Sequence, residues 1–145
     1  MATYRDMTPW SDSCVSSDGQ LIAVGWLGPG VEFANGRVAP EFFQRFKQLM
    51  AERFVPPGLP LSPGVASCPL CQFDPAMGNG VLFVPDGQRM FVTPFLAVHY
   101  VATHYYRPPD EFIDAVSTCP STGTRDYRVQ FLQAGGRQLM KVQGG

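Results

Sequence analysis

The fold is decided by the stretch "GVLFVPDGQRMFVTPFLAVHYVATH", residues 80–104, in which two short apolar runs flank a turn and a helical pattern follows. Runs rich in Val and Phe on either side of Pro-Asp-Gly predict a β-hairpin. Thr93 and Pro94 have the residue types of a helix N-cap and first turn, so "FLAVHYVATH" is predicted to be a helix. This helix carries His99 and His104, the only two histidines of the chain.

Two cysteines precede the hairpin. The segment "ASCPLCQF", residues 66–73, places Cys68 and Cys71 two residues apart, and 27 residues separate Cys71 from His99. Thiolates and imidazoles are the preferred ligands of Zn²⁺, and four of them close a tetrahedral structural site. The pattern therefore predicts a zinc-finger-like Cys2His2 site, with structural Zn²⁺ bound by Cys68, Cys71, His99 and His104.

The spacing of the two histidines sets a condition on this site. Five residues of a regular helix rotate by about 500°, so His99 and His104 would point roughly 140° apart. Both can bind one metal ion only if the helix ends or tightens before His104. Pro108 and Pro109 follow shortly and forbid its continuation.

Three other readings of these residues stay open at this stage. In the first reading, the cysteines are core or loop residues. The histidines then lie on a helix surface, or they are core residues whose hydrogen bonds are satisfied within the protein. A redox pair would need a helix to start at the cysteines and lower the thiol pKa, and "QFDPAMGNG" is a poor helix. A catalytic metal site needs an open position and a base, for which Asp74 and Glu111 are the candidates, but the chain has no HExxH. We therefore expect no catalytic residues and no enzyme.

Further elements follow from the apolar patterns. A buried strand is predicted over Leu21–Leu27, an amphipathic helix over Pro40–Phe54, and a third helix whose first turn is set by Pro109. In that third helix, Phe112, Ile113 and Val116 are expected to face inward. The tail "DYRVQFLQAGGRQLMKVQ" alternates around Ala-Gly-Gly, which predicts a second hairpin over about 125–142.

Length and composition indicate the architecture. The chain has 145 residues, of which 45% are hydrophobic and 16% charged, enough apolar residues for one core. We expect a single α+β domain over residues 1–145, with antiparallel strands and hairpins, about three helices and a zinc-binding core at about 66–117. Cys14 and Cys119 have no ligand-like spacing and are expected to be free thiols.

Charge and the absence of apolar segments indicate the compartment. The formal net charge is −1, with a basic excess in residues 121–145 and an acidic excess in residues 1–36, which is unfavourable for binding a phosphate backbone. The N-terminal residues show no apolar signal region, and no run approaches the roughly 20 apolar residues of a membrane span. We expect a cytoplasmic protein without membrane contact.

Several motifs together resemble a family of small uncharacterised bacterial proteins. They are "VGWL", "PEFF", "CPLC", "PDG" and, most specifically, "HYVATHYYRPPDEFIDAV", within about residues 4–116. The resemblance implies a metal site at the Cys and His motifs and brings no known activity with it. The chain differs from the family pattern in residues 121–145.

These observations lead to three functional hypotheses. The first is a small zinc-stabilised protein-interaction module, whose narrowest form is a bacterial immunity or defence-associated partner of another protein. The alternative is a nucleic-acid-binding zinc-finger-like protein, which the basic tail favours and the net charge opposes. The second alternative is a metal-dependent hydrolase.

Overall fold

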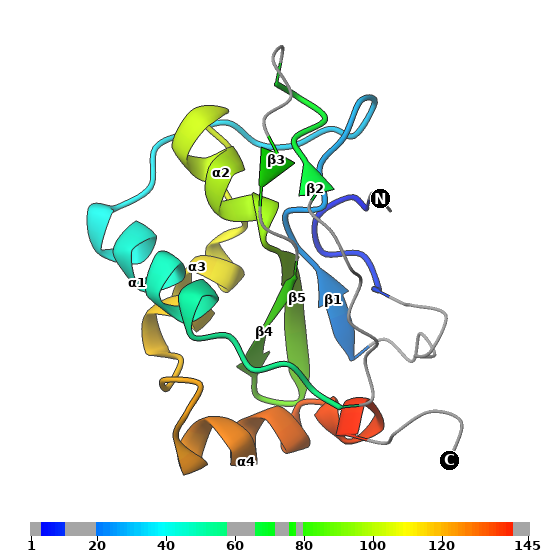
Figure 1. Cartoon of the computed structure of the whole chain (residues 1–145), viewed down its shortest axis with the longest axis vertical. Helices are drawn as coiled ribbons and strands as arrows, with labels where there is room; N and C mark the ends of the chain where they lie inside the picture. Colours follow the sequence, from blue (N-terminus) through cyan, green and yellow to red (C-terminus); the bar gives the residue numbers. More distant parts are fainter. Residues whose placement is uncertain (1–3, 11–19, 58–65, 72–75, 78–79, 141–145) are drawn as a thin grey trace.

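The computed structural model describes residues 4–10, 20–57, 66–71, 76–77 and 80–140, and it is α+β (Figure 1). In these residues a three-stranded mixed sheet of order β1-β5-β4, a two-stranded ribbon and four α-helices are present. The elements are β1 (Leu21–Ala23), α1 (Pro40–Ala51), β2 (Ala66–Ser67), β3 (Ala76–Met77), β4 (Val81–Asp86), β5 (Arg89–Pro94), α2 (Leu96–Thr103), α3 (Asp110–Thr118), α4 (Arg125–Gln133) and the 3-10 helix η1 (Gly136–Met140).

The predicted central hairpin is confirmed. Strands β4 and β5 pair antiparallel from Val81 with Pro94 to Asp86 with Arg89. The two-residue loop starts at Gly87, whose φ of +66° is a conformation that such tight loops require and glycine adopts at no steric cost. The predicted N-cap at Thr93 is wrong, because Thr93 and Pro94 extend β5 and the N-cap of α2 is Phe95.

The predicted strand over Leu21–Leu27 is shorter than expected. β1 ends at Ala23, and Gly25 follows with φ +83°. A Cβ at Gly25 would lie 2.8 Å from the Cβ of Ala97, so glycine lets α2 approach this segment closely. The predicted antiparallel pairing holds for β4 and β5, and β1 adds to β5 in parallel, so the three-stranded sheet is mixed.

Helices α1 and α3 pack together and against β4, as Figure 1 shows. The predicted helix over Pro40–Phe54 ends at Ala51. In α3, Phe112 and Val116 are buried and Ile113 packs against the core, as predicted. The core here is aromatic, since the Phe112 ring has edge-to-face contacts with Phe46 at 5.5 Å and Phe91 at 5.7 Å.

The predicted C-terminal hairpin over about 125–142 is wrong. Residues Arg125–Gln133 form α4, and Gly136–Met140 form η1. The helix is favoured because the side chain of Thr124 caps it by accepting from the Tyr127 amide, and because Tyr127 and Phe131, one turn apart, are both buried. The Tyr127 hydroxyl donates to the carbonyl of Phe83 at 2.6 Å, which fixes α4 to β4.

Candidate metal centre

The two cysteines lie in a tight turn after β2. The Cys71 amide donates to the Cys68 carbonyl at 3.4 Å, and the Leu70 amide donates to the Cys68 Sγ at 3.4 Å. The thiolate is the form of cysteine that binds a metal ion. Cys68 is buried and Cys71 is half-buried. Strand β2 is held by two residue pairs with β3, Ala66 with Met77 and Ser67 with Ala76.

The two histidines meet because α2 ends between them. His99 lies within α2, whereas His104 is its C-cap, with φ −108° and ψ 13°. The next residue, Tyr105, has a left-handed backbone with φ +56°, which turns the chain back after the helix. The condition set by the five-residue spacing is met, because α2 ends at Thr103 and His104 is its C-cap, and the ring centroids of His99 and His104 lie 5.1 Å apart.

The segment after His104 is anchored in the core. The hydroxyl of the buried Tyr106 donates to the Asp6 carboxylate at 2.7 Å, and the Gly25 amide donates to the other oxygen of that carboxylate at 3.0 Å. Burial raises the pKa of Asp6 against these two hydrogen bonds. The Tyr106 amide also donates to the Tyr100 carbonyl at 3.3 Å, which holds the reversed chain against α2.

Four donor atoms converge at this place. The Sγ of Cys71 lies 3.1 Å from the Nε2 of His99 and 3.4 Å from that of His104, and the Sγ of Cys68 lies 3.4 Å from the Nε2 of His104. All four ligand atoms lie within 4.8 Å of one another. Zinc–ligand bonds of about 2.0–2.3 Å imply tetrahedral edges of about 3.3–3.8 Å. The group formed by Cys68, Cys71, His99 and His104 could therefore hold one metal ion after small adjustments of side chains.

Neighbouring groups suit the imidazole of His99 to bind through Nε2. The Nδ1 of His99 lies 3.3 Å from the Thr103 hydroxyl, one turn further along α2. A hydrogen bond from Nδ1–H to this oxygen leaves Nε2 as the free lone pair. Burial, and then the proximity of His104, lower the pKa of His99, which favours the neutral ring that metals bind. Sequence reasoning missed Thr103, although its position four residues after His99 on a helix is the signal that identifies it.

Tyr100 lies beside the group and is fully buried. Burial, and then the nearby thiols of Cys68 and Cys71, raise its pKa, so its phenol stays protonated. The donor group itself contains no carboxylate among the residues that the structure describes. Four nitrogen and sulfur donors fill a tetrahedron, and this arrangement is typical of a structural site.

The other candidate residues do not join this group. Cys119 is buried at the end of α3, its thiol donates to the Pro120 carbonyl at 3.3 Å, and burial raises its pKa to about 11. Glu111 is exposed in the first turn of α3. Cys14 and Asp74 lie outside the described residues.

In the described part of the chain, no helix combines the length and the apolar character needed to cross a membrane.

Comparisons with known proteins give one match. Neither the curated proteins nor the solved structures include a match to the chain. One family, described as a domain of unknown function and called DUF7919, matches residues 2–117. This range includes all four residues of the metal centre and stops before α4 and η1. The chain belongs to the DUF7919 family.

Proposed function

We propose that the chain is a protein-interaction module stabilised by one structural Zn²⁺, bound by Cys68, Cys71, His99 and His104. The observation that carries this proposal is the convergence of two thiols and two imidazole Nε2 atoms within 4.8 Å. Zinc suits this donor set, because it accepts both sulfur and nitrogen ligands and imposes tetrahedral geometry. Bound zinc would join the short turn after β2 to the end of α2, two segments about 30 residues apart.

A non-catalytic role is supported by the way in which the donors are used. With four protein ligands, no coordination position is left for a water or substrate, which a hydrolytic zinc site requires. Both histidines of the chain are ligands, so neither can act as a general base. A partnership with a bacterial toxin or defence protein is the narrowest form of this proposal, and its support is the resemblance to bacterial proteins.

Elemental analysis tests the metal site. The full chain, purified without added metal, is expected to contain about one zinc ion per molecule. Cys68→Ser and His99→Asn should each abolish stoichiometric zinc, because each removes one of four ligands. Cys119→Ser is the matched control, since this buried thiol lies outside the group, and it should retain the zinc of the wild type. A folded wild-type protein without metal would contradict the proposal.

Co-purification tests the interaction role separately. A tagged full chain, isolated from its source cell at physiological salt, is expected to retain one protein partner in a stoichiometric complex. The partner should remain when nuclease is added, because the contact is between proteins. A zinc-containing chain that never enriches a partner would contradict the interaction role and leave the metal site intact.

A further inference from the structure

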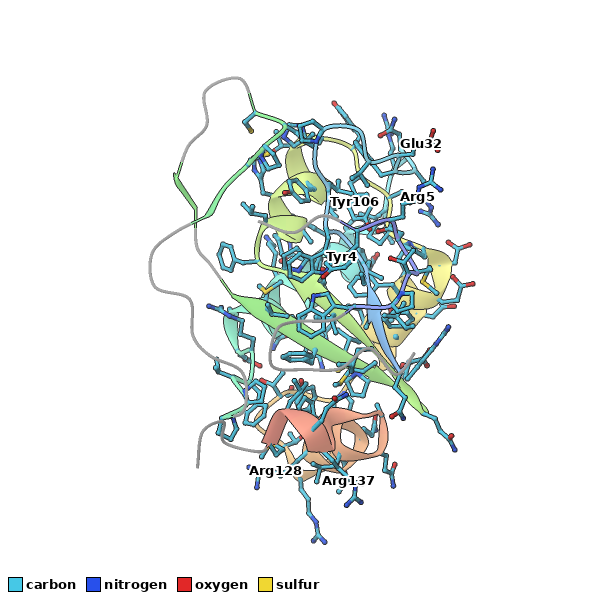
Figure 2. The ribbon with its side chains drawn as sticks, turned by 90° about the vertical axis from the view of Figure 1, so that its right-hand side faces the viewer. Tyr4, Arg5, Glu32, Tyr106, Arg128 and Arg137 are labelled. Atoms are coloured by element: carbon cyan, nitrogen blue, oxygen red, sulfur yellow. The ribbon has the colours of Figure 1, made fainter. Side chains whose placement is uncertain are left out.

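The exposed side of α4 and η1 combines positive charge with apolar side chains. We call this surface the α4 face and define it by Arg125, Arg128, Val129, Leu132, Arg137 and Met140. Residues 125, 128, 129 and 132 share one side of a helix, because successive residues are rotated by about 100°. Figure 2 shows Arg128 and Arg137 at the same end of the molecule, directed away from it. The α4 face lies beyond the region that the family matches, which ends at residue 117.

The arginines of the α4 face form no ion pair with the acidic residues that the structure describes. Within the described part of the chain, ion pairs are formed by Arg5, Arg89 and Arg107, and none involves an arginine of this face. Asp126 is the one acidic residue in residues 118–140, and it lies about 100° around α4 from Arg125. Three exposed guanidinium groups therefore form no ion pair with any residue that the structure describes.

Apolar groups lie between these charges. Val129 is 43% exposed and Met140 is 36% exposed, and they are two of four large hydrophobic residues with such exposure among the described residues. Leu132, half-buried, lies one helical turn from Arg128 and Val129. An exposed apolar group surrounded by arginines is a composition that favours a protein contact over a purely solvated surface.

Two hollows flank α4. The larger has a volume of about 830 Å³ and is lined by Leu132, Gln133 and Arg137, together with Gln20, just before β1, and Gln88, in the loop between β4 and β5. The smaller has a volume of about 20 Å³, lies between Arg128 and Met140, and has the rings of Phe54 and Phe131 in its wall. The side-chain amides of Gln88 and Gln133 in the first can pair with a polypeptide backbone, and the second offers an aromatic wall to a small apolar group.

We propose that the α4 face binds an acidic, amphipathic segment of another protein, in which apolar side chains alternate with Asp or Glu at helical spacing. This inference rests on the proposed interaction function and names the kind of partner. Carboxylates would pair with Arg125, Arg128 and Arg137, while apolar side chains cover Val129, Leu132 and Met140. Charge complementarity of this kind directs a partner to the face, and the apolar contacts retain it.

Fluorescence anisotropy with four labelled probes tests the proposal on the full zinc-loaded chain. The first probe is a 16-residue peptide with Leu on one helical side and Glu on the other. The second has the same composition in an order that spreads Leu around the helix. A 16-base-pair DNA duplex and vesicles of anionic phospholipid are the third and fourth. We expect the first peptide to bind at about 0.15 M salt, and the second to bind at least about ten-fold more weakly.

Variants locate the binding. Arg128→Glu/Arg137→Glu should weaken binding of the first peptide by at least about ten-fold, because two attractions become repulsions. Val129→Ser should weaken peptide binding as well, whereas binding driven by charge alone would survive it. Arg37→Glu is the matched control, since Arg37 is an exposed arginine outside the face, and it should bind like the wild type. Thermal unfolding, which reports on the core that holds α4, checks that each variant is folded.

Each remaining outcome overturns the proposal. Binding of the duplex without the first peptide would make the α4 face a nucleic-acid surface, and binding of vesicles alone would make it a lipid surface. Equal binding of the two peptides would remove the amphipathic requirement, and no binding of any probe would remove the site. Because zinc content is measured independently, failure here is distinguishable from failure of the metal site.

Discussion

Tyr105 illustrates how one residue positions a candidate metal ligand, His104. Its φ of +56° lies in the left-handed region, which costs a non-glycine residue about 1–2 kcal/mol. Its side chain is 71% exposed, so its packing does not offset this cost. The conformation persists because the segment is fixed on both sides. The Tyr105 carbonyl accepts from the Gly36 amide at 2.9 Å, and Tyr106 is anchored to Asp6.

Two substitutions at Tyr105 should therefore have opposite effects. Tyr105→Gly is expected to keep the free energy of unfolding or raise it by up to about 1 kcal/mol, because glycine adopts this φ freely. Tyr105→Val is expected to lower it by at least about 1 kcal/mol, because a β-branched residue is a genuine outlier there. Valine should also weaken metal binding by displacing His104. Urea unfolding and a zinc competition titration measure both effects. Equal behaviour of the two variants would show that the turn does not position the ligand.

At the scale of elements, local patterns were reliable where only one periodicity fitted the residues. The hairpin of β4 and β5 has a turn signal between two apolar runs, and the structure confirms it. In the tail, Tyr127, Val129 and Phe131 fit an alternating strand, while Tyr127 and Phe131 alone fit one side of a helix. The choice depends on contacts with Phe54 and Phe83, which lie at least 40 residues earlier in the chain, and local sequence does not contain them.

The cap of α4 provides a test at this scale. Thr124→Ala removes the side-chain oxygen that accepts from the Tyr127 amide at 3.3 Å, and it should lower the free energy of unfolding by about 1 kcal/mol. Ser117→Ala in the last turns of α3 is the matched control, since this exposed hydroxyl bonds to the Ile113 carbonyl within its own helix and caps nothing. It should change stability by less than about 0.5 kcal/mol. Thermal unfolding of both variants measures the difference, and equal losses would contradict the cap.

The candidate site was more predictable from the sequence than the fold of the whole molecule. Two cysteines and two histidines are rare residues in a short span, so their chemistry alone indicates which side chains come together. The parallel pairing of β1 with β5 brings together residues almost 70 positions apart, such as Leu21 with Met90. No turn motif in the local sequence predicts this pairing, because it depends on the burial of both strands in a common core.

The arrangement of the whole molecule predicts what metal removal will do. The cysteine turn of the candidate metal centre is attached to a ribbon of only two residue pairs. The aromatic contacts among α1, α3, α4 and the sheet lie elsewhere and involve no metal ligand. Loss of zinc should therefore release the turn and the end of α2 first, while the aromatic core keeps its structure.

Chelation of the wild-type protein is the measurement. A metal present at about a thousand times its dissociation constant stabilises the folded state by about 4 kcal/mol. For a protein of this size, loss of this stabilisation on metal removal should lower the midpoint temperature of thermal unfolding by about 10 °C. Before global unfolding, hydrogen exchange should accelerate in residues 66–71 and 100–104 and stay slow in α3 and β5. Cys119→Ser should respond to chelation as the wild type does, because its thiol is no ligand. Simultaneous loss of protection throughout the chain would show instead that the metal holds the entire core, so that the aromatic contacts alone are insufficient for folding.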